Sequence, residues 1–425
     1  MGLARWALVV LVTAVIVRLL PGFFHTLPKV VQGSVAPGWQ AVEHIFRSQV
    51  EQGLEKGAAF AVYHRGQLVV NLAGGYADVE AERPWRTDTV TCVYSSTKGV
   101  SAVAVALLVD RGYIAYDDPV ARYWPEFDQN GKENITVRQI LSHTAGLTVP
   151  DEDFSISDIV KDPERVSGIL ARQRPLWRPG SQHGYHGVTL GLYVDQLVRR
   201  VDPQHRDLAQ FFHQEIKLPY DIDFFVGLPS EENYRCARMY PPSPVLDIVK
   251  TGSFCFLPVV YRMLLDPASE PARMGENPSG WSVERSNDPE VRSIPCGATR
   301  GFGTASGLAK IYSLVAHGGS LLSDQVTKDM LIPRATGIDR VVNLNITYAS
   351  GMNLFESKVG SVMFGTPGAG GQMACGDRKY GLAWAYITNH HRLVEPLKDE
   401  RWTTLVDAVY DIAVKDDKAE RTKGG

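Results

Sequence analysis

The spacing of hydrophobic and polar residues predicts a helix, a β-hairpin and a second helix near the start of the chain. Helical spacing begins near Gly38, and the apolar positions fall on one face: Trp39, Val42, Ile45, Phe46 and Val50. Two short runs, 59–63 and 68–72, flank Arg65-Gly66 and are typical of a hairpin. The stretch 100–108 is apolar throughout, which predicts a buried helix.

The C-terminal part returns to strand patterns. Residues 308–315 predict a helix, and 348–355, 360–364 and 382–388 predict strands, with a glycine-rich turn at 365–371 before the last of them. A final helix is expected to bury one apolar face: Trp402, Leu405, Val406, Val409, Ile412 and Ala413.

These elements predict an α+β fold. One antiparallel sheet is built from both chain ends and flanked by terminal helices, with an inserted, mainly helical region at about 90–330. Proline-rich connections in 150–289 indicate long loops in that region. We expect an N-terminal segment and linker over 1–37, one domain over 38–415 and a charged, disordered tail over 416–425.

The N-terminus has the composition of a targeting segment. The first 42 residues contain no Asp or Glu, and an apolar run extends from Trp6 to Val17 before Arg18. This run predicts a signal-anchor and a single-pass membrane protein, with a cleaved signal (a secreted protein) or a mitochondrial presequence as alternatives. The sequons at Asn134 and Asn345 agree with a secretory route as glycosylation sites, although such triplets also occur by chance.

Charge and cysteine content exclude several functions. The net charge is −3, and no basic stripe interleaves with aromatic residues, so a nucleic-acid partner is not expected. The five cysteines have no C-x-x-C spacing, and His183 and His186 have no acidic neighbour, so we predict neither a metal site nor a cofactor. Most of the cysteines are expected to be buried thiols, and the oligomeric state stays open.

One short motif suggests nucleophilic catalysis. Ser95 and Lys98 stand three residues apart, directly before the apolar helix. On the first turn of that helix both side chains would face the same side, near free N–H groups that favour negative charge. A lysine whose pKa is lowered by burial can take the proton from a serine hydroxyl. S-x-x-K alone is a weak signal, so its context decides the interpretation.

That context resembles a known family. The segments 94–99, 117–120 and 140–147 follow in order, and 177–180 and 184–187 come next. Their succession is similar to the serine β-lactamase-like superfamily, which includes class C β-lactamases, DD-peptidases, related carboxylesterases and LACTB-type proteins. The resemblance covers roughly residues 38–415 and implies the β-lactamase/transpeptidase-like fold.

The resemblance also implies roles for individual residues. Ser95 would be the acylated nucleophile, Lys98 would assist removal of its proton, and Tyr185 would be the second base that also protonates the leaving group. The backbone N–H groups of Ser95 and Ala369 would form the oxyanion hole.

Two departures from the family pattern limit the chemistry. The usual Tyr-x-Asn element is here Tyr185-His186-Gly187, and Thr366 stands where the family places a Lys or His. The group that grips a substrate carboxylate is therefore missing. We expect His186, Thr366 and Gly368 to contact a small ester or amide substrate, with a structural role as the alternative for His186. An esterase is preferred, with a LACTB-type peptidase or a catalytically weak, membrane-tethered scaffold or binding pseudoenzyme as alternatives.

Overall fold

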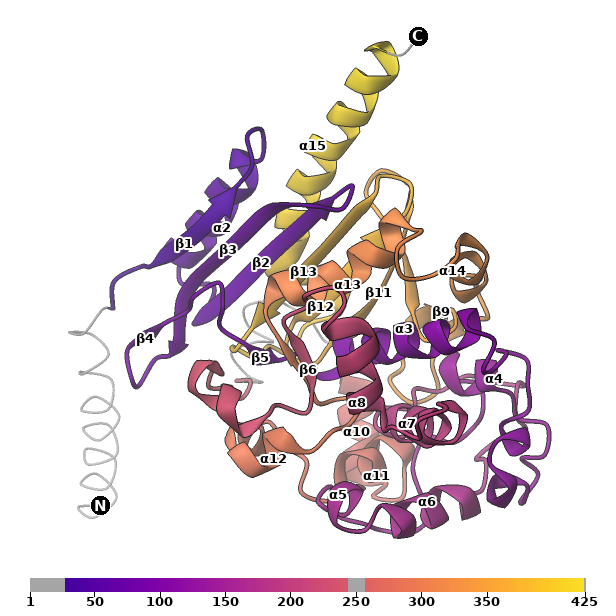
Figure 1. Ribbon diagram of the computed structural model, residues 1–425. Coiled ribbons are helices and arrows are strands. Elements are labelled where there is room, and N and C mark those ends of the chain that lie inside the picture. Colours follow the sequence, from indigo (N-terminus) through magenta and orange to yellow (C-terminus); the bar gives the residue numbers. More distant parts are fainter. Residues whose placement is uncertain (1–26, 244–256, 424–425) are drawn as a thin grey trace, which may run out of the picture.

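The computed structural model describes residues 27–243 and 257–423. Within these ranges the chain forms a ten-stranded sheet in the order β1-β3-β2-β13-β12-β11-β10-β9-β8, with β4 paired to β3 (Figure 1). Its strand pairings are antiparallel. The strands are β1 (Val31–Val35), β2 (Gly57–His64), β3 (Gln67–Asp78), β4 (Arg83–Pro84), β8 (Ala335–Ile338), β9 (Asn345–Tyr348), β10 (Asn353–Glu356), β11 (Val362–Gly368), β12 (Gln372–Asp377) and β13 (Leu382–Thr388).

The two ends of the chain meet in the middle of this sheet. Strand β2 pairs with β13, so that Ala61 lies opposite Ala385. Both strands are almost entirely buried because helices cover both faces of the sheet. The predicted α+β architecture, with one antiparallel sheet built from both chain ends, is confirmed.

Terminal helices cover one face of the sheet. Helices α2 (Gln40–Glu51) and α15 (Glu400–Lys423) pack there, and their apolar side chains form one core cluster with β2, β3, β12 and β13 (Figure 1). On the other face, α13 (Ala305–His317) joins a larger cluster shared with the helical region. Strands β11 to β13 therefore lie between two cores.

The helical region lies between β4 and β8. Its α-helices are α3 (Thr97–Asp110), α4 (Val137–Leu141), α5 (Asp158–Lys161), α6 (Pro163–Arg172), α7 (Thr189–Val201), α8 (Leu208–Phe212), α10 (Leu257–Leu265), α11 (Glu270–Glu276), α12 (Pro289–Ser293) and α14 (Asp324–Met330), besides α13. A small sheet, β5 (Thr91–Cys92), β7 (Gly301–Gly303) and β6 (Phe224–Val226), leads into α3. Helix α3 is buried from Thr97 to Leu108, as its apolar sequence predicts.

The structure differs from the pattern-based prediction in several places. The expected linker contains β1, which pairs with β3. The predicted strand 348–355 is two strands, β9 and β10, and the predicted turn at 365–371 is narrower because β11 continues to Gly368 and β12 starts at Gln372. The prediction of a disordered tail is wrong for 416–423, which continue α15.

The predicted signal-anchor lies within 1–26, outside the described residues. Among the helices that are described, none is both long and apolar enough to cross a bilayer.

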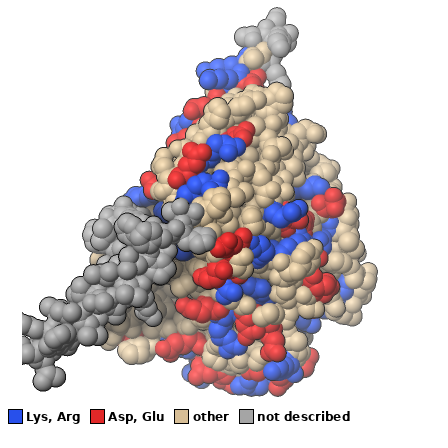
Figure 2. Space-filling model, turned by 90° about the vertical axis from the view of Figure 1, so that its left-hand side faces the viewer, with Lys and Arg blue, Asp and Glu red and all other residues tan. Residues whose placement is uncertain are grey.

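Cys92, Cys236, Cys296 and Cys375 are buried free thiols, as expected for most of the cysteines. Figure 2 shows acidic and basic side chains interspersed on one face of the molecule, where no extended basic patch is visible among the described residues.

Candidate active site

Ser95 lies on a short 3₁₀ turn, Tyr94–Ser96, that leads directly into α3. Tyr94 has a left-handed backbone (φ 45°), which a bulky residue rarely adopts, and it turns the chain sharply before the serine. The Ser96 hydroxyl donates to Thr366 O at 2.8 Å. Among its neighbours on this turn, Ser95 alone remains partly exposed, while Tyr94 and Ser96 are buried.

Lys98 is the polar group that faces the Ser95 hydroxyl. Its Nζ lies 3.1 Å from Ser95 Oγ and 3.0 Å from the carbonyl oxygen of Ala298. The side chain is 1% exposed, and burial lowers the pKa of Lys98 to about 7. A substantial fraction of the amine is therefore neutral near pH 7 and able to accept a proton.

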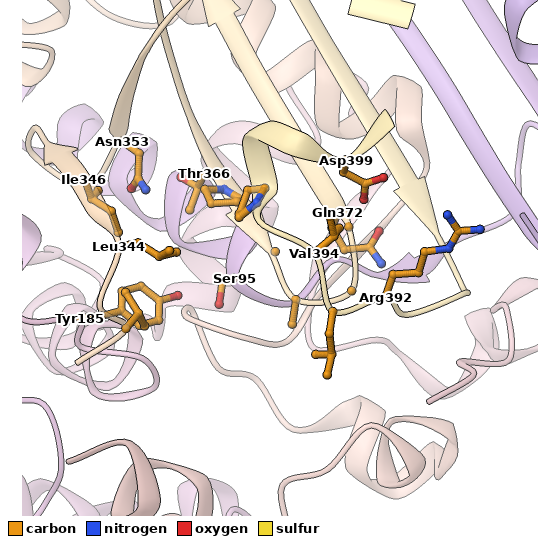
Figure 3. A pocket seen from close by; sticks show the side chains of 18 of the residues that line it. Ser95, Tyr185, Leu344, Ile346, Asn353, Thr366, Gln372, Arg392, Val394 and Asp399 are labelled. Atoms are coloured by element: carbon orange, nitrogen blue, oxygen red, sulfur yellow. The ribbon is translucent and has the colours of Figure 1, made fainter. Parts of the chain in front are cut away.

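Tyr185 lies on the other side of the serine. Figure 3 shows its hydroxyl directed toward Ser95, and Lys98 Nζ lies 4.6 Å from the centre of its ring. Burial raises the pKa of the Tyr185 phenol, so this hydroxyl is protonated at neutral pH. The buried carboxylate of Asp339 accepts the Tyr185 N–H at 3.2 Å and the Tyr348 hydroxyl at 3.0 Å, which anchors the tyrosine loop to the β8–β9 connection.

The glycine-rich turn between β11 and β12 approaches Ser95 from the sheet. A side chain at Gly368 would place its Cβ 2.3 Å from Val93 O, so the close approach of the two backbones requires glycine there. The next residue, Ala369, lines the same cavity as Ser95. This geometry brings together the two residues whose N–H groups were predicted to bind an oxyanion.

These groups open into a cavity of about 290 Å³. Its walls are mainly apolar, with Val342, Leu344 and Ile346 contributed from 342–346 and Val394, Pro396 and Trp402 from the β13–α15 connection and α15. Arg392 also lines it, but Figure 3 shows its guanidinium directed away from Ser95, and it donates to Leu54 O. In the described part of the lining, no lysine or histidine occurs.

The residues predicted to contact substrate lie in different surroundings. Thr366 and Gly368 line the cavity, although Thr366 is buried and its hydroxyl faces Tyr312 across Gly99. The prediction that His186 contacts substrate is wrong, because its side chain is fully buried outside the cavity lining.

His186 has a structural role instead. Its Nε2 accepts the Leu147 N–H at 2.9 Å, and its Nδ1 lies 2.8 Å from Gly184 O. Burial lowers the pKa of His186 to about 3, so the ring is neutral. It therefore holds the segment that carries Tyr185.

Several residues of the site had no sequence signal. Asp339, which accepts the Tyr185 N–H, is an isolated acid in a loop. The apolar cavity residues Val342, Leu344 and Ile346 lie before and at the start of β9 and belong to no catalytic motif. Trp402 was predicted only as part of a helix face, yet it also lines the cavity.

Asn134 and Asn345, the predicted glycosylation sites, are exposed. Within 27–243 and 257–423, no cluster of three or more His, Cys, Asp or Glu side chains could hold a metal ion.

The helix-flanked sheet built from both chain ends matches β-lactamase/transpeptidase-like structures, and it holds a Ser–Lys pair at the start of a buried helix with a tyrosine facing it. The chain belongs to the beta-lactamase family, whose model matches residues 42–408.

Its relatives include esterases. The "Esterase/beta-lactamase LipL" of Mycobacterium tuberculosis is 31% identical over 383 residues, which are 86% of this chain and 84% of that protein. A crystal structure of a family VIII carboxylesterase is 31% identical, with a TM-score of 0.79, and covers 90% of this chain and 100% of its own. A penicillin-binding protein homologue from Caulobacter crescentus is also 31% identical, with a TM-score of 0.76 and the same coverage.

Proposed function

We propose that this protein is a serine esterase that hydrolyses uncharged esters with an apolar acyl group through an acyl-enzyme on Ser95. The observation that carries the proposal is the 3.1 Å contact between Ser95 Oγ and Lys98 Nζ, in a cavity that Ala369 also lines. Likeness to proteins named esterase and carboxylesterase supports the same reaction class.

In the first step Lys98 accepts the Ser95 proton while Oγ attacks the ester carbonyl carbon. The carbonyl oxygen becomes an oxyanion, which the N–H groups of Ser95 and Ala369 stabilise. The C–O bond to the alcohol then breaks. Because its phenol is protonated, Tyr185 donates a proton to the departing oxygen and regains one from the Lys98 ammonium.

Deacylation follows with water as the nucleophile. A water molecule loses a proton to the same Lys98–Tyr185 pair and attacks the acyl carbon, which releases the acid. Ser95 Oγ then recovers its proton. Both halves of the cycle use one base and one oxyanion site, so a single cavity serves them.

The apolar cavity walls favour an ester over an anionic substrate. Thr366 replaces the cation that would pair with a substrate carboxylate, and the Arg392 guanidinium points elsewhere. A buried carboxylate without a partner costs several kcal/mol. We therefore propose that neutral esters are hydrolysed in preference to β-lactams or peptides with a free carboxylate.

The test combines a probe and two substrates. Wild-type protein should be labelled by a fluorophosphonate and should hydrolyse p-nitrophenyl butyrate faster than the anionic β-lactam nitrocefin, and Ser95→Ala should lose both labelling and turnover. Ser96→Ala is the matched control, because Ser96 bonds Thr366 O behind the cavity. Folded wild-type protein without labelling or turnover would support the scaffold alternative, and faster cleavage of a D-Ala-D-Ala peptide would support the peptidase.

A further inference from the structure

The turn that carries Ala369 contains residues with little conformational preference of their own. Gly370 and Gly371 have φ of 84° and 108°. Glycine adopts such positive φ values readily, but it adopts other backbone conformations as readily. An oxyanion donor is effective only if it is held in place before the reaction. Some group outside the turn must therefore fix it.

Arg401, at the start of α15, contacts this turn directly. Its Nη2 donates to the carbonyl oxygen of Gly370 at 2.9 Å. A Cβ at Gly371 would lie only 2.0 Å from the same Nη2, so the guanidinium occupies the space that a side chain would need. The carbonyl group of Gly370, the residue after Ala369, is thus held by the Arg401 side chain, which the proposed chemistry does not use, together with the backbone N–H of Arg392 at 3.3 Å.

The guanidinium is itself held on every side. Asp399 accepts from Arg401 Nε at 2.8 Å and from Nη2 at 2.6 Å, while Glu55 accepts from Nη1 at 2.9 Å. Nη1 also donates to His390 O at 2.8 Å. The Arg401 side chain has no exposed surface. A rigid planar fork with five donors suits this task, which an ammonium group cannot reproduce.

Glu55 is fixed in turn by the sheet. Its carboxylate accepts from the hydroxyls of Tyr386 and Thr388 on β13, in the second case at 2.8 Å. Two carboxylates flank one guanidinium, so the cluster supplies no net positive charge to an oxyanion. Its effect on the site is therefore one of position.

We infer that Arg401 is a positioning residue for the oxyanion hole, which it acts on through the carbonyl group of Gly370; this rests on the proposed esterase function. Loss of the fork would leave Ser95, Lys98 and the apolar walls in place and would free the N–H of Ala369 to move. Acyl transfer would slow while ground-state binding of the ester stayed nearly the same.

Arg401→Lys is the test, because it keeps the charge and removes the fork. With p-nitrophenyl butyrate, we expect kcat to fall by about 10- to 100-fold, which is less than the fall caused by removing an oxyanion donor outright. We expect KM to change by less than about threefold. Affinity for a boronic acid that forms a tetrahedral adduct on Ser95 should fall with kcat. Arg206→Lys is the matched control, because that arginine is also nearly buried between two carboxylates, Asp202 and Glu215. It lies in the helical region, between α7 and α8.

A second variant covers the case in which Arg401→Lys does not fold. Glu55→Gln leaves the bonds of Arg401 to Asp399 and Gly370 in place, so we expect a smaller fall in kcat in the same direction, again without a rise in KM. If the wild type is active and kcat is unchanged in either folded variant, the inference about Arg401 is overturned while the esterase function stands. The same holds if Arg206→Lys lowers kcat as much as Arg401→Lys does. Wild-type protein without turnover or labelling would remove the esterase function and this role together.

Discussion

The buried amine of Lys98 should make the stability of the protein depend on pH in a way that one substitution can isolate. The pKa falls from an ordinary value of 10.5 to about 7 in the folded protein because burial disfavours the ammonium form. At about 1.4 kcal/mol per pH unit, this corresponds to about 5 kcal/mol of lost stability at acidic pH. Lys98→Met removes the penalty together with the base.

The sign follows from proton binding. Between about pH 7 and pH 10.5 the unfolded chain holds the Lys98 proton and the folded chain does not, so wild-type stability rises with pH across this window. Lys98→Met lacks this contribution. The bonds from Lys98 Nζ to Ser95 Oγ and Ala298 O are also lost, at a cost of about 1–3 kcal/mol that does not depend on pH.

The free energy of unfolding, measured in urea at pH 7 and pH 9, checks this reasoning. From pH 7 to pH 9 the wild type should gain about 2–3 kcal/mol relative to Lys98→Met. Lys161→Met, at an exposed position on α5, should show no such change. A constant difference between wild type and Lys98→Met over this range would refute the lowered pKa.

Three further results are expected. Because Lys98 must be neutral to accept a proton, kcat/KM should rise with pH, level off above about 7 and follow a single ionisation in a pH-rate profile; a rate that falls over this range would exclude Lys98 as the base. Tyr185→Phe should retain its circular dichroism spectrum and lose about 10²- to 10⁴-fold in kcat, since it keeps the ring and removes the proton donor; near wild-type kcat would remove Tyr185 from the mechanism. Gly368→Ala should abolish ester turnover because its Cβ would meet Val93 O at 2.3 Å; a fully active variant would show that the two backbones need not approach so closely.

Strong local patterns predicted the main elements well. Strand 382–388 matches β13 at both ends, because a buried strand between polar turns has a distinct apolar run. Strand β12 was missed, since Ala374, Gly376 and Asp377 give it no strand-like composition. The tail beyond 415 was predicted as disordered from its charge, yet residues 416–423 continue α15, which begins at Glu400.

The sequence by itself predicted the pairing of Ser95 with Lys98 and the order of the segments that surround them, because residues three apart lie on the same face of a helical turn. Only the tertiary structure decided which residues hold the site in place and which residues line its cavity. Glu55 and Arg401 are 346 residues apart in sequence and bonded in the fold, and His186, adjacent to Tyr185, faces the core instead of the cavity. Contacts of such long range depend on how the sheet brings the two chain ends together, and no local spacing encodes them.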